Sequence, residues 1–187
     1  MNIFYLHENP QICAEMHIDK HCVKMIIEYA QLMSTAHRML DGLEYEGRTK
    51  NGRKIKRYLM PNIEKEQTLY KVSHINHPSA VWARESKENY SWLYQMWCCL
   101  CDEYTFRYGK IHLTDKKLRR ALKSYPENIS DTPFTQPPQA MPDDVKVVND
   151  SIQAYRNYYI KEKSRFAKWE PRSLTPKWYK EGLNETK

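Results

Sequence analysis

The chain has 187 residues, of which 41% are hydrophobic and 12% aromatic, and this composition excludes an extended disordered chain. Its 30 basic and 23 acidic residues give a net charge of +7 and an isoelectric point of about 9.1, which favours a polyanion as partner. There is no apolar run long enough to cross a bilayer and no signal-peptide pattern, so we expect no membrane partner and a cytoplasmic location, in the host if the protein is phage-encoded. We predict one mainly α-helical domain over residues 1–187 with a small basic β-hairpin.

The N-terminal part of the chain predicts a short arm followed by a long helix. Residues 1–6 are apolar and β-prone, but they are too short for more than an edge strand or a buried arm. The helix follows Pro10 and extends to about Asp41, where Gly42 is expected to end it in the left-handed conformation. One face has the alternating spacing of three and four that predicts burial, at Ile18, Cys22, Met25, Tyr29, Leu32, Ala36 and Leu40.

Beside this apolar face runs a stripe of ionisable and polar side chains at the same helical spacing. The stripe consists of His17, His21, Lys24, Glu28, Gln31 and Thr35, with Lys20 one turn before Lys24. It is either an ordinary solvated face, in which Lys24 and Glu28 form a helix-stabilising pair, or a functional site. The second interpretation is favoured because Glu28 borders the apolar face, and a half-buried carboxylate flanked by amines is typical of active sites.

The basic surplus is concentrated after this helix. Residues 48–57 contain no acidic residue and carry six cations, Arg48, Lys50, Arg53, Lys54, Lys56 and Arg57. Asn51-Gly52 at the centre is a strong turn signal, so we predict a β-hairpin over residues 44–59, the alternative being a mobile charged loop. Either form would neutralise the phosphate backbone of a nucleic acid.

The middle of the chain predicts two further helices. Residues 62–72 form a short one, and Asn76-His77-Pro78 caps a second long helix that ends near Gly109. The inner face of the long helix is marked by Trp82, Asn89, Leu93, Met96, Leu100 and Tyr104. Arg84 and Lys87 lie a turn apart on another face, which is either solvated surface or, together with His77, a set of DNA contacts.

The C-terminal part is rich in proline and aromatic residues. After a basic helix over residues 113–124, five prolines predict an ordered surface loop or lid over residues 126–143. A last helix over residues 144–168 carries the stripe Val148, Ile152, Tyr155, Tyr159 and Phe166, and Trp169, Trp178 and Tyr179 follow in a proline-broken tail. Aromatic residues at this density are more often packing residues than platforms for stacked bases.

The cysteines and histidines do not predict a metal site. Cys98, Cys99 and Cys101 share one predicted helix but point in different directions, and zinc sites favour a two-residue gap. His17 and His21 have helical spacing without the glutamate of a metalloprotease helix. We therefore predict reduced thiols and no metal or other cofactor, and the lack of a Walker-type glycine-rich loop argues against hydrolysis of nucleoside triphosphates.

Three motifs in the first 110 residues resemble one known family. They are a D-K-x-x-x-K-x-x-x-E helix (Asp19-Lys20, Lys24, Glu28), an N-H-P-x-x-x-W segment (Asn76-His77-Pro78, Trp82) and an acidic-aromatic-arginine helix end (Asp102-Glu103-Tyr104, Arg107). The combination resembles the superfamily of pyrimidine dimer DNA glycosylases related to bacteriophage endonuclease V, in particular a divergent branch of phage and bacterial proteins. The resemblance covers residues 1–110 in outline.

The resemblance implies an all-helical fold that bends DNA, extrudes a base and breaks the glycosidic bond with an amine nucleophile helped by a glutamate. Glu28 would be that carboxylate, because the attacking amine must be deprotonated and the imine and sugar cation that follow are stabilised by nearby negative charge. In family members the nucleophile is the α-amine of an N-terminal residue exposed after methionine removal. Asn2 is large enough to leave Met1 in place, so Met1, Lys20 and Lys24 are the candidate amines here.

We therefore expect a DNA glycosylase or lyase of DNA repair or DNA modification, with the helix 17–35 lining its pocket and the hairpin 44–59 gripping phosphates. Two alternatives stay open. A base-modifying transferase acting on thymine derivatives such as 5-hydroxymethyluracil would use His17, His21 and Glu28 as acid and base. A non-catalytic DNA-binding or host-interaction phage protein would keep the basic hairpin and leave the polar stripe as surface.

Overall fold

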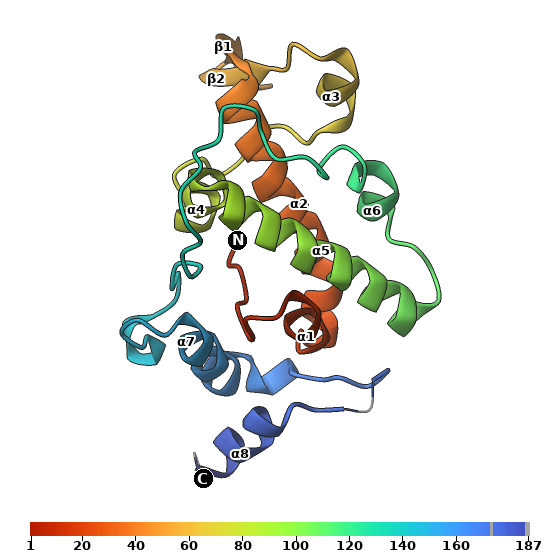
Figure 1. The fold of residues 1–187 in the computed structure, drawn as a ribbon, viewed down its shortest axis with the longest axis vertical. Helices are drawn as coiled ribbons and strands as arrows, with labels where there is room; N and C mark the ends of the chain where they lie inside the picture. Colours follow the sequence, from red (N-terminus) through yellow and green to blue (C-terminus); the bar gives the residue numbers. More distant parts are fainter. Residues whose placement is uncertain (173, 186–187) are drawn as a thin grey trace.

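The computed structural model describes residues 1–172 and 174–185 and is mainly α-helical, which confirms the predicted fold class (Figure 1). The α-helices are α1 (Pro10–Glu15), α2 (Asp19–Asp41), α3 (Ile63–Thr68), α4 (Pro78–Glu85), α5 (Lys87–Tyr108), α6 (Leu113–Leu118), α7 (Ser151–Tyr158) and α8 (Lys177–Glu185). Two 3-10 turns, η1 (Asp143–Val145) and η3 (Ser164–Phe166), and a π-helical turn, η2 (Tyr159–Lys163), accompany them. Strands β1 (Leu43–Arg48) and β2 (Lys54–Leu59) pair antiparallel.

The core lies where α5 and α4 pack against the central helix α2 (Figure 1). The predicted apolar face of α2 is confirmed, since its side chains are buried from Ile18 to Ala36 and Leu40 is half-buried. The inner face predicted for the second long helix is buried from Trp82 to Tyr104. Buried side chains from the N-terminal arm to α8 join in one hydrophobic cluster. None of the helices described is long and apolar enough to span a bilayer.

Residues 1–6 form a buried arm, which is the second of the two forms that we predicted. The Phe4 amide donates to the Tyr29 hydroxyl at 3.1 Å, and the Arg156 guanidinium donates to the Leu6 carbonyl at 2.9 Å. A buried segment outside a sheet must satisfy its backbone groups in other ways. These side chains therefore replace the neighbouring strand that an edge strand would need.

The prediction of one continuous helix from Pro10 to Asp41 is wrong, because the structure has two helices there, α1 and α2. Ile18 is extended, with φ −61° and ψ 155°, and the following amide of Asp19 donates to the Lys168 carbonyl at 2.8 Å. This partner comes from the far end of the chain. The break therefore depends on a tertiary hydrogen bond that helical periodicity does not report.

The second long helix is also divided, and Ser86 separates α4 from α5. Ser86 is extended, with φ −148° and ψ 141°, and its hydroxyl accepts hydrogen bonds from the amides of Glu88 and Asn89. The same hydroxyl donates to the Thr132 carbonyl at 2.5 Å. Serine is therefore both the N-cap of α5 and the attachment point of the proline-rich loop.

The predicted left-handed end at Gly42 is wrong, whereas Gly109 does end α5 in this conformation with φ 65°. Gly42 has φ −88° and is required for another reason. A Cβ atom there would lie 2.3 Å from the carbonyl oxygen of Arg38 and 3.3 Å from Cβ of Tyr58. The glycine therefore allows the hairpin to start directly against the last turn of α2.

The hairpin that we predicted over residues 44–59 is confirmed. Its register runs from Leu43 opposite Leu59 to Arg48 opposite Lys54. Gly52 in the turn has φ 76°, a value that favours glycine. The hairpin projects from the end of α2 (Figure 1).

The proline-rich segment is an ordered loop, as predicted, and lacks regular secondary structure until η1 begins at Asp143. The Asp41 carboxylate at the end of α2 accepts hydrogen bonds from the amides of Glu127 and Asn128, both at 3.0 Å. Further along, the Thr135 amide donates to the Asn89 side chain of α5 at 2.9 Å. The loop is thus fixed at several points along its length.

The C-terminal helices differ from the prediction in their bounds. The last long helix was expected over residues 144–168, but α7 begins only at Ser151, where the Asp150 side chain caps it. Val148 precedes the helix and is 89% exposed, so its place in the aromatic stripe is wrong, while Tyr155 and Tyr159 are fully buried. The basic helix over 113–124 is shortened to α6, and the expected tail contains α8.

Candidate amine and carboxylate site

The Glu28 carboxylate lies between two amines. Its Oε2 atom is 3.6 Å from the α-amine of Met1, and its Oε1 atom is 3.1 Å from Nζ of Lys24. The Met1 and Glu28 side chains are 6% and 18% exposed, whereas that of Lys24 is 70% exposed. Figure 1 marks the N-terminus beside α4, at the middle of the molecule. The structure thus brings together one carboxylate and two of the three candidate amines, one sheltered and one in solvent.

His77 caps α4 and is electrostatically coupled to the same pair. Its Nδ1 atom accepts a hydrogen bond from the Ser79 amide at 3.1 Å, so the neutral ring carries its proton on Nε2. Burial lowers the pKa of His77, the charges of the Met1 α-amine and of His74 lower it further, and Glu28 opposes them. His77 therefore lies close enough to the amine and carboxylate for their charges to act on its ring, although it was predicted only as a DNA contact.

His74 belongs to this neighbourhood and was not predicted from the sequence. It has φ 52°, a left-handed conformation that costs a non-glycine residue about 1–2 kcal/mol. Its ring forms a short hydrogen bond with the Ser73 hydroxyl, and the Ser73 amide donates to the Thr35 hydroxyl of α2 at 3.2 Å. This turn therefore fixes the position of His77 relative to α2. The only sequence signal is the cluster of polar residues before Pro78.

His17 and His21 of the predicted stripe lie in the core with protein partners. The Nε2 and Nδ1 atoms of His17 are 2.9 Å from the Tyr29 hydroxyl and 2.8 Å from the Cys13 carbonyl oxygen. Nδ1 of His21 is 2.7 Å from the Tyr159 hydroxyl. Burial lowers the pKa of His17 to about 4 and that of His21 to about 2, so both rings are neutral near pH 7. These contacts support a packing role.

Lys20 does not reach the carboxylate. It is eight residues before Glu28, which is about 12 Å along α2. Its ammonium lies 4.9 Å from the centroid of the Phe166 ring, in a cation–π contact. The predicted stripe is therefore divided, and Lys24 and Glu28 form the part that meets the N-terminal arm.

The acidic-aromatic-arginine motif forms a buried ion network. The Arg107 side chain is fully buried and donates to Glu103 at 2.6 Å and to Asp19 at 2.8 Å. Arg172 donates to the other oxygen of Glu103 at 2.6 Å. Burial alone would raise the pKa of Glu103, but the two guanidinium groups lower it overall. The network holds the start of α2, the end of α5 and the C-terminal segment together.

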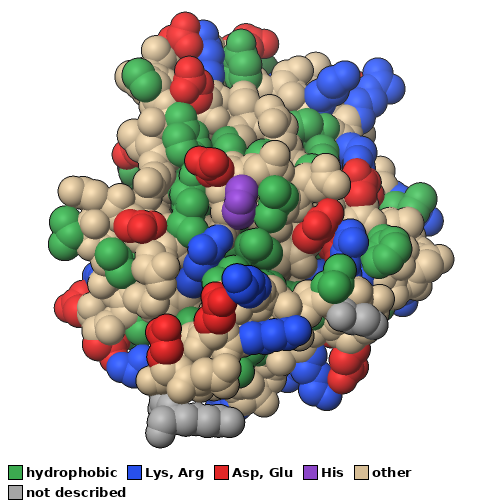
Figure 2. All heavy atoms as spheres, turned by 60° about the horizontal axis from the view of Figure 1, so that its bottom comes forward, with side chains coloured by type: hydrophobic (Ala, Val, Ile, Leu, Met, Phe, Trp, Pro, Cys, Tyr) green, Lys and Arg blue, Asp and Glu red, His purple; other side chains and the backbone are tan. Residues whose placement is uncertain are grey.

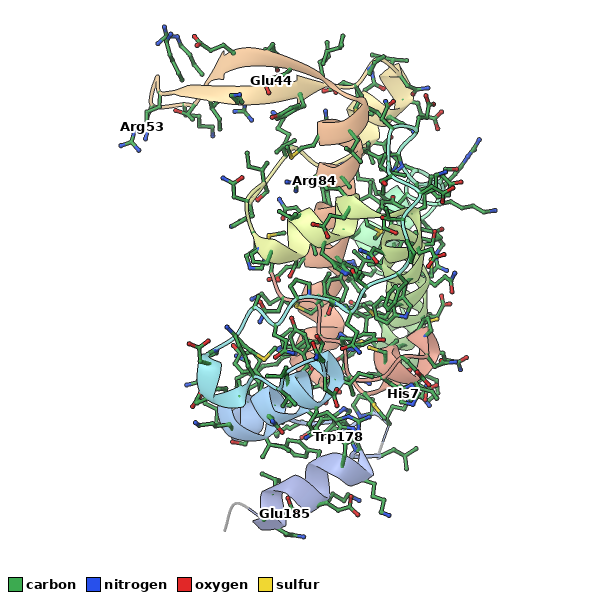
Figure 3. The ribbon with its side chains drawn as sticks, turned by 60° about the vertical axis from the view of Figure 1, so that its left-hand side comes forward. His7, Glu44, Arg53, Arg84, Trp178 and Glu185 are labelled. Atoms are coloured by element: carbon green, nitrogen blue, oxygen red, sulfur yellow. The ribbon has the colours of Figure 1, made fainter. Side chains whose placement is uncertain are left out.

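The basic hairpin keeps part of its charge unpaired. Two predicted cations form ion pairs with carboxylates of β1, Lys54 with Glu46 at 3.0 Å and Lys56 with Glu44 at 2.8 Å. The cations without a carboxylate partner among the residues that the structure describes are Arg48, Lys50, Arg53 and Arg57. Figure 3 shows Arg53 at the tip of the hairpin, away from the body. This end of the molecule therefore presents a surplus of positive charge.

The two other predicted DNA contacts differ in their surroundings. Arg84 lies between α4 and the hairpin (Figure 3), and its buried Nη1 atom has no hydrogen-bond partner in the described part of the chain. Lys87 pairs with Asp131 at 3.4 Å and lies 5.5 Å from the centroid of the Tyr125 ring. Lys87 therefore contacts Tyr125, just before the proline-rich loop, and Asp131 within it, whereas Arg84 faces the space between α4 and the hairpin.

The face that carries α8 has acidic and basic side chains intermixed (Figure 2). The five cysteines are unpaired, as predicted. Within residues 1–172 and 174–185, no three His, Cys, Asp or Glu side chains gather in a way that could hold a metal ion.

Comparison with known proteins finds no family model, no curated protein and no solved structure that matches the chain.

Proposed function

We propose that the chain is a DNA glycosylase with lyase activity, which excises a modified or damaged base in the cytoplasm through the amine and carboxylate site. The observation that supports this most is the α-amine of Met1 within 3.6 Å of the half-buried Glu28 carboxylate. An amine beside a carboxylate that can take its proton is the arrangement that covalent catalysis at a sugar carbon requires. The unpaired cations of the hairpin supply the affinity for duplex phosphates.

In the proposed reaction the uncharged amine attacks C1′ of the target nucleotide, and the C1′–N bond to the base breaks with its electron pair leaving on the base. Glu28 takes the proton that the amine loses. Formation of the imine then breaks the C1′–O4′ bond, and Glu28 returns the proton to O4′. One carboxylate thus serves both steps: the base leaves as an anion, the sugar ends as a protonated imine, and Glu28 is a carboxylate again at the end.

The experiment is borohydride trapping on duplex DNA that carries ultraviolet photoproducts, 5-hydroxymethyluracil or an abasic site, with undamaged duplex as control. We expect a covalent adduct specific to the altered duplexes. Glu28→Gln should lower the trapping rate by about 10²- to 10⁴-fold while duplex binding is retained. Glu64→Gln is the matched control, because it makes the same change at an exposed position of α3.

Two variants identify the amine. An N-terminal extension that acylates the Met1 α-amine should abolish the adduct if this amine attacks, and Lys24→Met should abolish it if the side chain does. Peptide mapping of the adduct gives an independent answer. Normal binding to every duplex without any adduct would refute imine chemistry and leave a DNA-binding protein.

A further inference from the structure

The two faces of the hairpin differ in chemistry. Directly opposed residues of an antiparallel pair share a face, and successive residues alternate between faces. One face therefore carries Leu43, Tyr45 and Gly47 of β1 with their partners Leu59, Arg57 and Ile55. The other carries Glu44, Glu46 and Arg48 with Tyr58, Lys56 and Lys54. The first face is apolar and aromatic with one cation, and the second contains both hairpin ion pairs.

The apolar face borders a groove rather than the core. The groove has a volume of about 340 Å³, and this face contributes Tyr45, Gly47, Ile55 and Arg57 to it. Arg48, Lys56 and Tyr58 of the other face also reach its lining. The opposite wall includes Lys71 and Val72 of the segment after α3. Tyr45 is 50% exposed and Ile55 is 38% exposed, so an aromatic and an aliphatic surface remain open to a ligand.

The groove has a positive charge surplus. Glu66 also lines it, but the Arg38 guanidinium lies 2.5 Å from its carboxylate and compensates its charge. Arg57 and Lys71 form no ion pair with any residue that the structure describes. An anionic ligand with an apolar planar part suits this combination, because the cations bind the anion and the ring of Tyr45 stacks on the planar part.

Gly47 determines where Arg57 lies. A Cβ atom at Gly47 would be 2.7 Å from Cγ of Arg57, so the arginine side chain crosses β1 directly over the glycine. Any larger residue would have to displace the stem of Arg57. The backbone thus keeps the guanidinium close to the groove instead of releasing it into solvent.

From this geometry we propose that the groove binds one unpaired nucleotide of a DNA strand, with its base against Tyr45 and Ile55 and its phosphate between Arg57 and Lys71. The DNA partner rests on the proposed function, but the groove is separate from the amine and carboxylate site and requires no base excision. Stacking on an exposed aromatic ring is independent of base identity, since every base has a π-face. The groove therefore reads that a nucleotide is unpaired, not which base it carries.

The test is a fluorescence titration of the full chain with a single-stranded oligonucleotide that carries 2-aminopurine, whose emission falls when it stacks on an aromatic ring. We expect quenching with the unaltered protein and with Tyr45→Phe. With Tyr45→Ala the quenching should disappear and the affinity should fall about 5- to 150-fold, the loss typical of one stacked base. The matched control is Tyr125→Ala, because Tyr125 is similarly exposed, at 43%, and lies outside the hairpin.

A second variant tests the phosphate contact. Gly47→Ala should weaken binding and make the dependence of affinity on salt concentration shallower, because it displaces Arg57. Unchanged quenching in Tyr45→Ala would overturn the proposal, as would equal affinities of all the variants or a lack of quenching by the unaltered protein. The outcome does not depend on imine trapping, because the quenching reports stacking of 2-aminopurine on the ring and not breakage of a glycosidic bond. Failure of the glycosylase proposal and failure of the groove proposal are therefore distinguishable.

Discussion

Arg38 connects the hairpin to the body, and its replacement should destabilise the fold strongly. Its side chain is 3% exposed and donates to the carbonyl oxygens of Tyr58, Glu66, Leu69 and Tyr70 and to the Glu66 carboxylate, at distances of 2.5 to 3.0 Å. Arg38→Met keeps much of the aliphatic stem but removes every one of these donors. The four carbonyl oxygens would then lose these donors in a largely dry site, while the Glu66 carboxylate would keep the Met60 amide, which donates to it at 2.8 Å.

We expect Arg38→Met to lower the free energy of unfolding by about 3 kcal/mol. This value is the lower end of the cost of removing one partner from a buried pair, because the Glu66 side chain is still 29% exposed. For a chain of this size the loss corresponds to a fall in Tm of about 6–12 °C. Urea titration followed by circular dichroism measures the first quantity, and a thermal scan measures the second.

Arg119→Met is the matched control. Arg119 also pairs with two carboxylates, those of Asp115 and Asp102, but its side chain is 39% exposed, so we expect a loss of about 1 kcal/mol or less. A loss below 1 kcal/mol for Arg38→Met, or equal losses for the two variants, would show that the hairpin is not held by this guanidinium. The reasoning about its buried acceptors would then be wrong.

Two further predictions concern salt and pH. Replacing Arg53 and Arg57 by alanine should reduce the slope of log affinity for duplex DNA against log salt concentration by about 0.9 per lost phosphate contact. Lys54→Ala should change this slope less, because Lys54 is paired with a carboxylate. Equal slopes for the two variants in filter-binding assays would contradict the assignment. Burial lowers the pKa values of His17 and His21 below their unfolded values, so their contribution to stability is complete above about pH 6.5 and falls as the pH drops towards 4. Urea titrations at a series of pH values should show this decline in the free energy of unfolding. His21→Phe should reduce the slope of the free energy of unfolding against pH by up to about 1.4 kcal/mol per pH unit. An identical slope in that variant would count against a buried neutral imidazole at His21.

The parts of the fold that depend on local pattern could be predicted, and the parts that depend on distant partners could not. The core face of α2 follows from apolar spacing alone, and the hairpin follows from Asn51-Gly52 between two β-prone segments. The break before Asp19 and the break at Ser86 depend on carbonyl groups far along the chain. A window of neighbouring residues contains no information about such partners.

The same distinction applies to the site. The sequence placed Glu28 and Lys24 one turn apart and named Met1 as an amine, because helical spacing and the motif are local. It could not decide whether His17 and His21 face solvent, because their burial depends on the arm and on η2 packing over the start of α2. Tyr45 was not singled out, although its alternation with Leu43 and Gly47 in β1 was a signal that could have marked it.

The arm of residues 1–6 makes the order of chain synthesis important for assembly. The Leu6 carbonyl accepts a hydrogen bond from Arg156, which is 150 positions later in the sequence. The Phe4 ring stacks on His21 and lies 5.3 Å from the ring centroid of Tyr159. Contacts of such large sequence separation are slow to form, because the intervening chain must be ordered first. On the ribosome the arm can meet Glu28 and Tyr29 of α2 early, but its contacts with Arg156 and Tyr159 form only after α7 and η2 have emerged. The arm is therefore fixed in its final place in one of the last steps of folding.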